Sequence, residues 1–344
     1  MTTVLDMAAY YHILQIIRKR PLDINIETTN ICPMKCAFCC NRVYQRPLTV
    51  MDLALFEDIV RQYYQLGGGA LGLSSMQSDL FSDPMLLKRI KILKKYKGKL
   101  WIYTTTPLIS CKRFSDKELL YILRIFDCLQ ISIEGHDPES YRVMGGVDGF
   151  AILKEQLERI NKIIKGNSLR IRVDLCFRTY QKKELLESEF FKEISSIFHV
   201  YNIKDTFFTW FGTVRNKDLP QGAKAIVRKN VGKKENCSIP NTSLAVMANG
   251  EVVGCGCIDW LGKYTVGDCK ENTLQEIWRS HRAVRFRKAF QIGRLPSICR
   301  ECDAYVSMQS MKSKKLLRYQ PTDGLYYLVR RDGVDNHNKG GQRK

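Results

Sequence analysis

The sequence predicts an α/β fold in which parallel strands form a partly open barrel around a polar interior. Strand-like runs recur between residues 22 and 211, and helical patterns separate them. Strands that alternate with helices favour a parallel sheet with helical crossovers. Two of the runs carry polar side chains on one face, whereas a strand covered by helices on both faces would be apolar on both. The polar faces therefore have to line something other than a layer of helices.

Each predicted element follows from a local pattern. The predicted strands are 22–28, 70–75, 100–106, 128–135, 169–177 and 205–211. Helices are expected to begin at Thr49-x-x-Asp52 and at Ser115-x-x-Glu118, because a hydroxyl followed three residues later by an acid has the spacing of a capping box. Leu153, Leu157, Ile160 and Ile164 fall on one face of a further helix.

The alternation of polar and apolar residues is clearest in two of the strands. Arg170, Arg172, Asp174 and Cys176 share one face of the fifth strand, and Gln130, Ser132 and Glu134 share one face of the fourth. A partly open barrel with helices outside and a ligand-filled lumen accounts for this pattern, and barrel active sites lie at the C-terminal ends of the strands. A sheet with one face in solvent would show the same alternation and stays open as an alternative.

Three cysteines follow the first predicted strand directly, in Thr29-Asn30-Ile31-Cys32-Pro33-Met34-Lys35-Cys36-Ala37-Phe38-Cys39. Thiolates are the usual ligands of iron–sulfur clusters, and short fixed spacings let one loop wrap one cluster. Three ligands leave the fourth iron of a cubane open for chemistry. A structural zinc site would need four ligands, and a disulfide framework fits poorly because the chain shows no cleavable signal peptide. The 13 cysteines are better explained by metal binding in a reducing cytoplasm.

The Cys32-x3-Cys36-x2-Cys39 spacing, with Phe38 just before the last cysteine, closely resembles the radical S-adenosylmethionine (SAM) superfamily. The resemblance implies an α/β fold with a partial (β/α)6, TIM-like barrel. It also implies that a [4Fe-4S] cluster binds SAM through its open iron. Reductive cleavage of SAM would then yield a 5′-deoxyadenosyl radical that abstracts hydrogen from a substrate.

Two stretches resemble the parts of this family that hold the methionine portion of SAM. Ser78-Asp79, after a run of three glycines, occupies the place of the family's glycine-glutamate motif, which implies that Ser78 and Asp79 lie at the SAM amino group. Arg142 is the candidate for the SAM carboxylate, because a guanidinium can bind a carboxylate through two hydrogen bonds. An ordinary surface arginine is the alternative for Arg142.

Four more residues are expected to contact SAM by the same resemblance. Thr105, at the end of the third strand, stands where relatives contact the ribose. Ser132 matches the family's fourth-strand serine, and Glu134 stands where aspartate is commoner. Phe38 is the aromatic residue of the cysteine loop. All four would lie at the C-terminal edge of the barrel.

A second cysteine set lies between residues 237 and 302. Its members are Cys237, Cys255, Cys299 and Cys302, and the intervening Asn249-Gly250 predicts a hairpin turn between short strands. Four thiolates make a complete ligand set for a cubane and satisfy zinc equally well. The arrangement, with a Thr273-x-x-Glu276 helix start, resembles the SPASM/twitch extension of radical SAM enzymes. Residues 303–344 contain no cysteine, so the resemblance implies the twitch type, with one auxiliary [4Fe-4S] cluster.

Cys257 and Cys269 fall in the same region without an assigned partner. Either could replace a cluster ligand or return a hydrogen atom to a substrate radical, as a thiol does in some radical SAM epimerases. They are therefore the candidate catalytic cysteines. The alternative is that they are small buried apolar residues, as most free cysteines are.

The expected domain organisation is an N-terminal helical segment 1–21, a barrel 22–215, an auxiliary-cluster domain 230–310 and a basic C-terminal segment 311–344 with a disordered tail. The formal charge is +20, and no run of 18 apolar residues could span a membrane. Basic stretches at 228–229, 233–234, 312–315 and 330–331, with Arg279, Arg282 and Arg285 at helical spacing, concentrate the charge in the C-terminal half. An acidic flavodoxin or ferredoxin, an anionic substrate and nucleic acid are the partners that could exploit this charge.

The resemblance implies a cytoplasmic radical SAM oxidoreductase or related enzyme that modifies C–H bonds. About 20 residues precede the first strand, too few for a separate peptide-recognition domain, so a sugar, cyclitol or amino-sugar is the expected substrate, through dehydrogenation or epimerisation. A ribosomal-peptide maturase is the runner-up, and a tRNA-modifying enzyme is the third candidate. A non-catalytic iron–sulfur sensor also stays open, because Ser78-Asp79 and Thr105 depart from the family's SAM-binding pattern.

Overall fold

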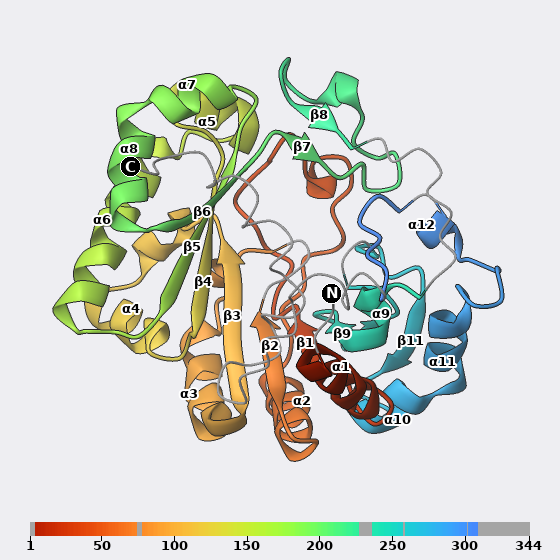
Figure 1. The fold of residues 1–344 in the computed structure, drawn as a ribbon. Helices are drawn as coiled ribbons and strands as arrows, with labels where there is room; N and C mark the ends of the chain where they lie inside the picture. The colour runs from red at the N-terminus through yellow and green to blue at the C-terminus, as the bar shows by residue number, and fades with distance from the viewer. Residues whose placement is uncertain (1–3, 74–77, 227–235, 257–258, 301, 309–344) are drawn as a thin grey trace.

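A computed structural model describes residues 4–73, 78–226, 236–256, 259–300 and 302–308 of the chain (Figure 1). The strands are β1 (Asp23–Ile26), β2 (Gly69–Leu73), β3 (Leu100–Thr106), β4 (Cys128–Ile133), β5 (Arg172–Arg178), β6 (Val200–Lys204), β7 (Thr206–Phe207), β8 (Lys224–Ala225), β9 (Ser243–Val246), β10 (Glu251–Val253) and β11 (Thr265–Asp268). The α-helices are α1 (Val4–Ile17), α2 (Leu53–Gln65), α3 (Leu86–Tyr96), α4 (Asp116–Leu123), α5 (Pro138–Gly145), α6 (Phe150–Gly166), α7 (Lys182–Glu187), α8 (Glu189–Ile197), α9 (Ser238–Thr242), α10 (Leu274–Arg279), α11 (His281–Lys288) and α12 (Ser297–Arg300). The C-terminal segment expected at 311–344 lies outside the described residues.

One sheet runs through both halves of the protein. Its order is β11-β10-β9-β1-β2-β3-β4-β5-β6, and β1 to β6 are parallel neighbours joined by helical crossovers, as the partial barrel requires (Figure 1). On the other side of β1, β9 pairs in parallel with it, with Asp23 opposite Ser243. The antiparallel β10 and β11 complete the sheet. The C-terminal strands therefore extend the barrel sheet beyond β1.

Five of the six strand predictions are confirmed, with ends shifted by up to three residues. The sixth is wrong, because the edge strand β6 is Val200–Lys204 rather than 205–211. The aromatic residues at 207–211 suit a strand, yet Trp210 and Phe211 have positive φ angles of 49° and 59°, which no strand contains. The residues after β6 therefore form the short β7 and then a turn.

The capping predictions at Ser115 and Thr273 are confirmed, since both residues form complete capping boxes. The prediction at Thr49 is wrong: Asp52 itself is the N-cap of α2 and accepts hydrogen bonds from the backbone N–H groups of Ala54 and Leu55. Aspartate is a good N-cap on its own and needs no hydroxyl partner. Arg279 ends α10 and Ser280 is the N-cap of α11, so Arg279 does not share a helix with Arg282 and Arg285.

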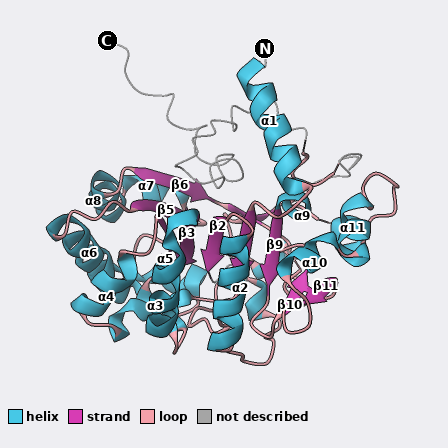
Figure 2. Ribbon diagram, turned by 90° about the horizontal axis from the view of Figure 1, so that it is seen from below, coloured by secondary structure: helices cyan, strands magenta, loops and turns pink. Residues whose placement is uncertain are grey.

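Helices cover the outer face of the sheet and polar residues fill the inner face. Figure 2 shows α2, α3, α4 and α6 along one side of the strands. On the inner face the Tyr103 hydroxyl contacts the carboxylate of Asp23 and the side-chain oxygen of Asn25, at 2.9 to 3.2 Å. Gly72 makes room for this group, because a Cβ there would lie 2.3 Å from the Asn25 oxygen.

Part of the inner polar face is buried. Ser132, Glu134 and Asp174 are only 7%, 2% and 8% exposed, whereas Gln130 and Arg172 are half-buried and Arg170 is exposed. The three buried residues favour a polar lumen over a sheet face in solvent. None of the helices in the described ranges is both long and apolar enough to cross a membrane.

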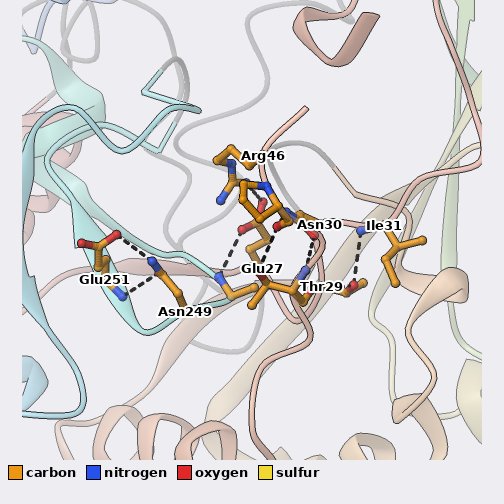
Figure 3. A network of polar contacts seen from close by, with 10 residues as sticks. Glu27, Thr29, Asn30, Ile31, Arg46, Asn249 and Glu251 are labelled. Carbon is orange, nitrogen blue, oxygen red and sulfur yellow. Dashed lines mark hydrogen bonds and ion pairs between the residues drawn. The ribbon is translucent and has the colours of Figure 1, made fainter. Parts of the chain in front are cut away.

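The carboxylate of Glu27, just after β1, joins the segment after the cysteine loop to the β9–β10 turn (Figure 3). It is fully buried, pairs with Arg46 after the cysteine loop, and accepts a 3.1 Å hydrogen bond from the backbone N–H of Ala248 in the β9–β10 turn. The Glu27 N–H donates to the Val246 carbonyl at 2.9 Å. Nearby, the Asn30 side chain accepts a 2.8 Å hydrogen bond from the Thr49 N–H. This bond closes the base of the segment 30–49, which contains the three cysteines. The cysteine loop and the C-terminal hairpin thus share one anchor.

We expect Glu27→Ala to lower the free energy of unfolding by about 3–5 kcal/mol, because it removes the fully buried carboxylate that pairs with Arg46 and accepts from the Ala248 N–H. Glu27→Gln should cost less, since an amide oxygen can still accept from Ala248. Glu57→Ala is the matched control, because the pair that Glu57 forms with Lys95 is exposed and should contribute at most about 1 kcal/mol. Urea unfolding of anaerobically purified protein, followed by circular dichroism, measures the three losses. Equal losses for the two alanine variants would show that Glu27 is no anchor.

Candidate functional site

The cysteine loop lies at the C-terminal end of β1 and is held from two sides. The N–H groups of Lys35 and Ala37 donate to the carbonyls of Gly145 and Met144 at the end of α5, at 2.9 and 2.8 Å. From the segment after β2, the Asp79 N–H donates to the Ile31 carbonyl at 2.9 Å. These bonds position all three cysteines by backbone contacts.

The thiols of the loop are poorly solvated. Cys36 is buried, and Cys32 and Cys39 are half-buried. Burial raises the pKa of the Cys36 thiol well above its ordinary value, and burial with the nearby Asp79 raises the pKa of Cys32. A hydrogen bond with Cys40 lowers the pKa of the Cys39 thiol instead. A bound metal stabilises thiolates that burial alone would keep protonated. The chemistry of three thiols on one loop fits a cluster with three protein ligands.

Beside the loop, β4 and β5 bring a polar group into contact with Phe38. Arg178 donates to Ser132 and lies 3.7 Å from the carboxylate of Glu134, and its guanidinium lies 5.3 Å from the centre of the Phe38 ring. Burial raises the pKa of Glu134, while Arg178 and Ser132 oppose that shift. Three of the residues expected at SAM are thereby brought together. Arg178 was not anticipated, although it continues the polar alternation of β5 two residues beyond Cys176.

Asp79 and Thr105 are placed near this group but are engaged in local contacts. Asp79 is fully buried and accepts hydrogen bonds from Thr106 at 2.7 Å, from the Phe81 N–H at 3.3 Å and from Ser82 at 3.3 Å. Burial raises its pKa, and these donors oppose the rise. Thr105 instead contacts Gln130 at 3.0 Å.

Two buried polar atoms here lack a hydrogen-bond partner: Ser78 Oγ and Glu134 Oε2. Buried polar atoms are normally paired, so these two are free to bind a ligand with complementary groups. Their chemistry fits the ammonium and hydroxyl groups of SAM, which can donate to them. Both atoms belong to residues expected to contact SAM.

Arg142 does not join the group. Its side chain is exposed on α5 and pairs with Glu139, one turn earlier on the same helix. The contacts of Arg142 are those of a surface arginine. Arg178, half-buried beside Phe38 and Glu134, is the better candidate for a carboxylate of the ligand.

The second cysteine set converges on one apolar pocket. Cys237, Cys255, Cys299 and Cys302 line it together with Ile239, Pro240, Phe290, Ile298 and Tyr305. The cysteines come from the start of α9, the end of the β10 segment, α12 and the residues after α12. Among the described residues, no three His, Cys, Asp or Glu side chains stand close enough to hold a single metal ion. The fit to an iron–sulfur cluster therefore rests on the shared pocket and on the chemistry of four thiols.

Of the two candidate catalytic cysteines, Cys257 lies outside the described residues. Cys269 follows β11, donates its N–H to the Gly250 carbonyl at 2.9 Å and is not among the residues that line the pocket. Burial raises the pKa of its thiol to about 12. Cys269 therefore packs as a small apolar residue.

One turn connects the two cysteine sites. In residues 209–212, after β7, the indole N–H of Trp210 donates to the Phe38 carbonyl at 3.0 Å, between Cys36 and Cys39. The preceding Thr209 N–H donates at 2.6 Å to Asp303, the residue after Cys302. Trp210, Phe211 and Gly212 all have positive φ angles, a conformation that bulky residues rarely adopt. The structure around them has to enforce this turn.

Comparisons with known proteins agree with the fold and with both cysteine sites. A sequence model of the Radical SAM superfamily matches residues 26–186, and a model of the SPASM iron-sulfur cluster-binding domain matches residues 237–303. Family membership implies a [4Fe-4S] cluster with SAM at the first site and further iron–sulfur binding at the second.

Solved structures with the same fold include three well-covered examples. BtrN in complex with AdoMet and 2-DOIA is 15% identical with a TM-score of 0.56, over 83% of this chain and 94% of that one. SuiB of Streptococcus suis bound to S-adenosylmethionine is 13% identical with a TM-score of 0.56, over 90% and 79%. The anSMEcpe structure with AdoMet and the Cp18Cys peptide is 13% identical with a TM-score of 0.54, over 86% and 95%. The chain belongs to the radical SAM superfamily and carries a C-terminal iron–sulfur cluster-binding domain of the SPASM type.

Proposed function

We propose that this enzyme is a radical SAM oxidoreductase that removes hydrogen from a small polar metabolite, a sugar, cyclitol or amino-sugar. The observation that carries the proposal is the turn at 209–212, which contacts both the Phe38 carbonyl in the first cysteine loop and Asp303 beside the second cysteine pocket. A site for accepting a second electron would thus adjoin the site where hydrogen is abstracted. That arrangement suits dehydrogenation, and epimerisation is the redox-neutral variant.

The residues of the barrel mouth would bind and orient the cofactor. When bound, the first cluster and SAM supply the 5′-deoxyadenosyl radical. Arg178 is suited to the carboxylate of SAM, because it is positively charged and held by Glu134 and Ser132. Phe38, stacked on Phe207 with ring centres 4.6 Å apart, offers a flat apolar surface. The backbone N–H of Asp79 would hold the cysteine loop at the Ile31 carbonyl. Its carboxylate, which accepts a hydrogen bond from Thr106, would attract the ammonium of SAM.

The polar side chains on the inner face of the sheet support a small hydrogen-bonding substrate. The solved neighbours include BtrN with 2-DOIA, and also SuiB with its precursor peptide and anSMEcpe with a peptide. A peptide maturase therefore remains the second candidate, and a tRNA-modifying enzyme the third. We further propose a flavodoxin or ferredoxin as reductant. Product analysis with cyclitols, amino-sugars and peptides distinguishes the substrate classes.

We predict that Arg178→Met weakens SAM binding by roughly 1.5–3 kcal/mol, the scale of a hydrogen bond to a charged group. Arg142→Met is the matched control and should leave SAM affinity unchanged, because Arg142 is exposed and paired within α5. Equilibrium binding of SAM to reconstituted protein measures both, with iron content as a check on the cluster. A larger loss of SAM affinity in Arg142→Met than in Arg178→Met would show that Arg142 binds the SAM carboxylate, as the sequence predicted.

We predict that Asp303 and Trp210 act together on SAM affinity. Asp303→Ala removes the acceptor of the Thr209 N–H, and Trp210→Phe removes the donor to the Phe38 carbonyl, so the two changes should show a coupling energy of about 0.5–3 kcal/mol. Asp303→Asn should bind SAM nearly as the parent does, because its amide oxygen can still accept. Additive effects on SAM binding, or a failure of asparagine to rescue, would show that the turn does not link the sites.

We predict that changing Cys299 and Cys302 together to alanine abolishes substrate conversion but leaves uncoupled SAM cleavage at saturating SAM. SAM cleavage and substrate conversion should separate because the first cysteine set follows β1 in the barrel, whereas Cys299 and Cys302 line the C-terminal pocket. A melting curve must accompany the assay, since metal binding at this pocket contributes folding free energy. Elemental analysis of the parent distinguishes iron from zinc at the pocket. Zinc there, or normal product from a folded double variant, would rule out the electron-acceptor role.

A further inference from the structure

A buried tyrosine hydroxyl lies against the first cysteine loop and takes no part in the contacts described so far. Tyr141, on α5, is fully buried. Within the described residues its hydroxyl makes one hydrogen bond, a 3.8 Å contact to the Sδ atom of Met34. Met34 lies between Cys32 and Cys36 in the chain. The hydroxyl therefore faces the loop that carries the cluster ligands.

The docking of α5 on the loop explains this position. The backbone N–H groups of Lys35 and Ala37 donate to the carbonyls of Gly145 and Met144 at 2.9 and 2.8 Å. Tyr141 precedes these two residues by four and three positions on the same helix. Residues with that spacing lie on one face of a helix. The hydrogen bonds that hold the cysteine loop thus also bring Tyr141 to it.

Glycines make room for the tyrosine. At Gly149 a Cβ would lie 3.0 Å from Cε1 of Tyr141 and 3.5 Å from its hydroxyl oxygen. At Gly135, where φ is 136°, a Cβ would lie 2.5 Å from the Tyr141 backbone nitrogen. Phe150 packs against the ring with the ring centres 6.0 Å apart. The ring is therefore enclosed by its surroundings, and the hydroxyl has a defined place.

The hydrogen bond that the hydroxyl makes is a weak one. A thioether sulfur is a weak acceptor, and buried tyrosine hydroxyls usually find a stronger partner. Tyr63, which is also fully buried, donates to the carbonyl of Leu22 at 2.7 Å. Burial raises the pKa of Tyr141, and the nearby Glu134 and Cys36 raise it further. The hydroxyl therefore keeps its proton and is available to donate to a better acceptor.

We propose that the Tyr141 hydroxyl donates a hydrogen bond to a sulfur of the cluster bound by Cys32, Cys36 and Cys39, and that it thereby raises the reduction potential of this cluster. A cluster becomes more negative when it gains an electron, and the positive end of an O–H dipole stabilises the added charge. Hydrogen bonds to the sulfurs are one of the factors that set such potentials. The inference depends on the cluster that membership of the superfamily implies and on none of the substrates proposed above.

The test removes the hydroxyl and keeps the ring. Tyr141→Phe is compared with Tyr63→Phe, which removes an equally buried hydroxyl near the start of β1, at the opposite end of that strand from the cysteine loop. Met34→Leu removes the thioether and leaves the Tyr141 hydroxyl in place. The midpoint potential of each reconstituted protein is measured without SAM by a redox titration followed by electron paramagnetic resonance. Addition of SAM identifies the signal of the first cluster, and iron content, melting temperature and SAM affinity are measured in parallel.

We expect Tyr141→Phe to lower the equilibrium constant for cluster reduction about tenfold, which corresponds to about 59 mV for one electron. Its iron content should match the parent and its melting temperature should change little, because the lost bond to a thioether is weak. Tyr63→Phe should show the opposite pattern, a lower melting temperature at an unchanged potential. Met34→Leu should keep the potential of the parent.

Several results would overturn the proposal. An unchanged potential in Tyr141→Phe would do so, and so would loss of iron from this variant. An equal drop in Met34→Leu would show that the hydroxyl acts only by holding Met34. Weaker SAM binding in Tyr141→Phe at an unchanged potential would assign the hydroxyl to SAM instead. If the parent forms no SAM-sensitive signal, the inference fails together with the assignment of the first cluster.

Discussion

The pairing of β1 with β9, closed by the buried carboxylate of Glu27, is the constraint on which both cysteine sites depend. In a partial barrel β1 would otherwise be an edge strand with unpaired N–H and C=O groups. The parallel β9 satisfies those groups from Asp23 to Ile26, and Glu27 then binds the turn after β9 and Arg46 after the cysteine loop. Both sites are thereby built on neighbouring strands of one sheet. Movement of one relative to the other would break buried polar contacts.

The turn at 209–212 adds a second connection on the opposite side of the sites. Left-handed backbone at bulky residues costs of order 1–3 kcal/mol each, so Trp210 and Phe211 hold this conformation only because the surroundings favour it. The Phe38 carbonyl and Asp303 are two of the contacts that hold the turn, and each belongs to a different cysteine site. The Val214 N–H adds a hydrogen bond to the Thr209 carbonyl at 2.8 Å.

Positive charge serves two different purposes near the first cluster. Arg178 is enclosed, in contact with Ser132, Glu134 and Phe38, where a single guanidinium can fix the orientation of a bound carboxylate. Lys35 and Arg42 are exposed to solvent, where charge acts at longer range.

The sequence by itself determined the strand that leads into the three cysteines, the second cysteine set and most of the barrel strands, because these features depend on spacing and alternation within a few residues. It also indicated the polar lumen through Ser132, Glu134 and Asp174. Only the tertiary structure decided that Arg178 rather than Arg142 lies beside Glu134, since helix α5 turns Arg142 outward and β5 brings Arg178 in from a distant part of the chain. The sequence likewise did not predict the pairing of β1 with β9, the absence of Cys269 from the lining of the pocket, or the strained turn at Trp210. Each depends on contacts between segments far apart in the chain, and a local sequence pattern does not indicate which distant segments will be in contact.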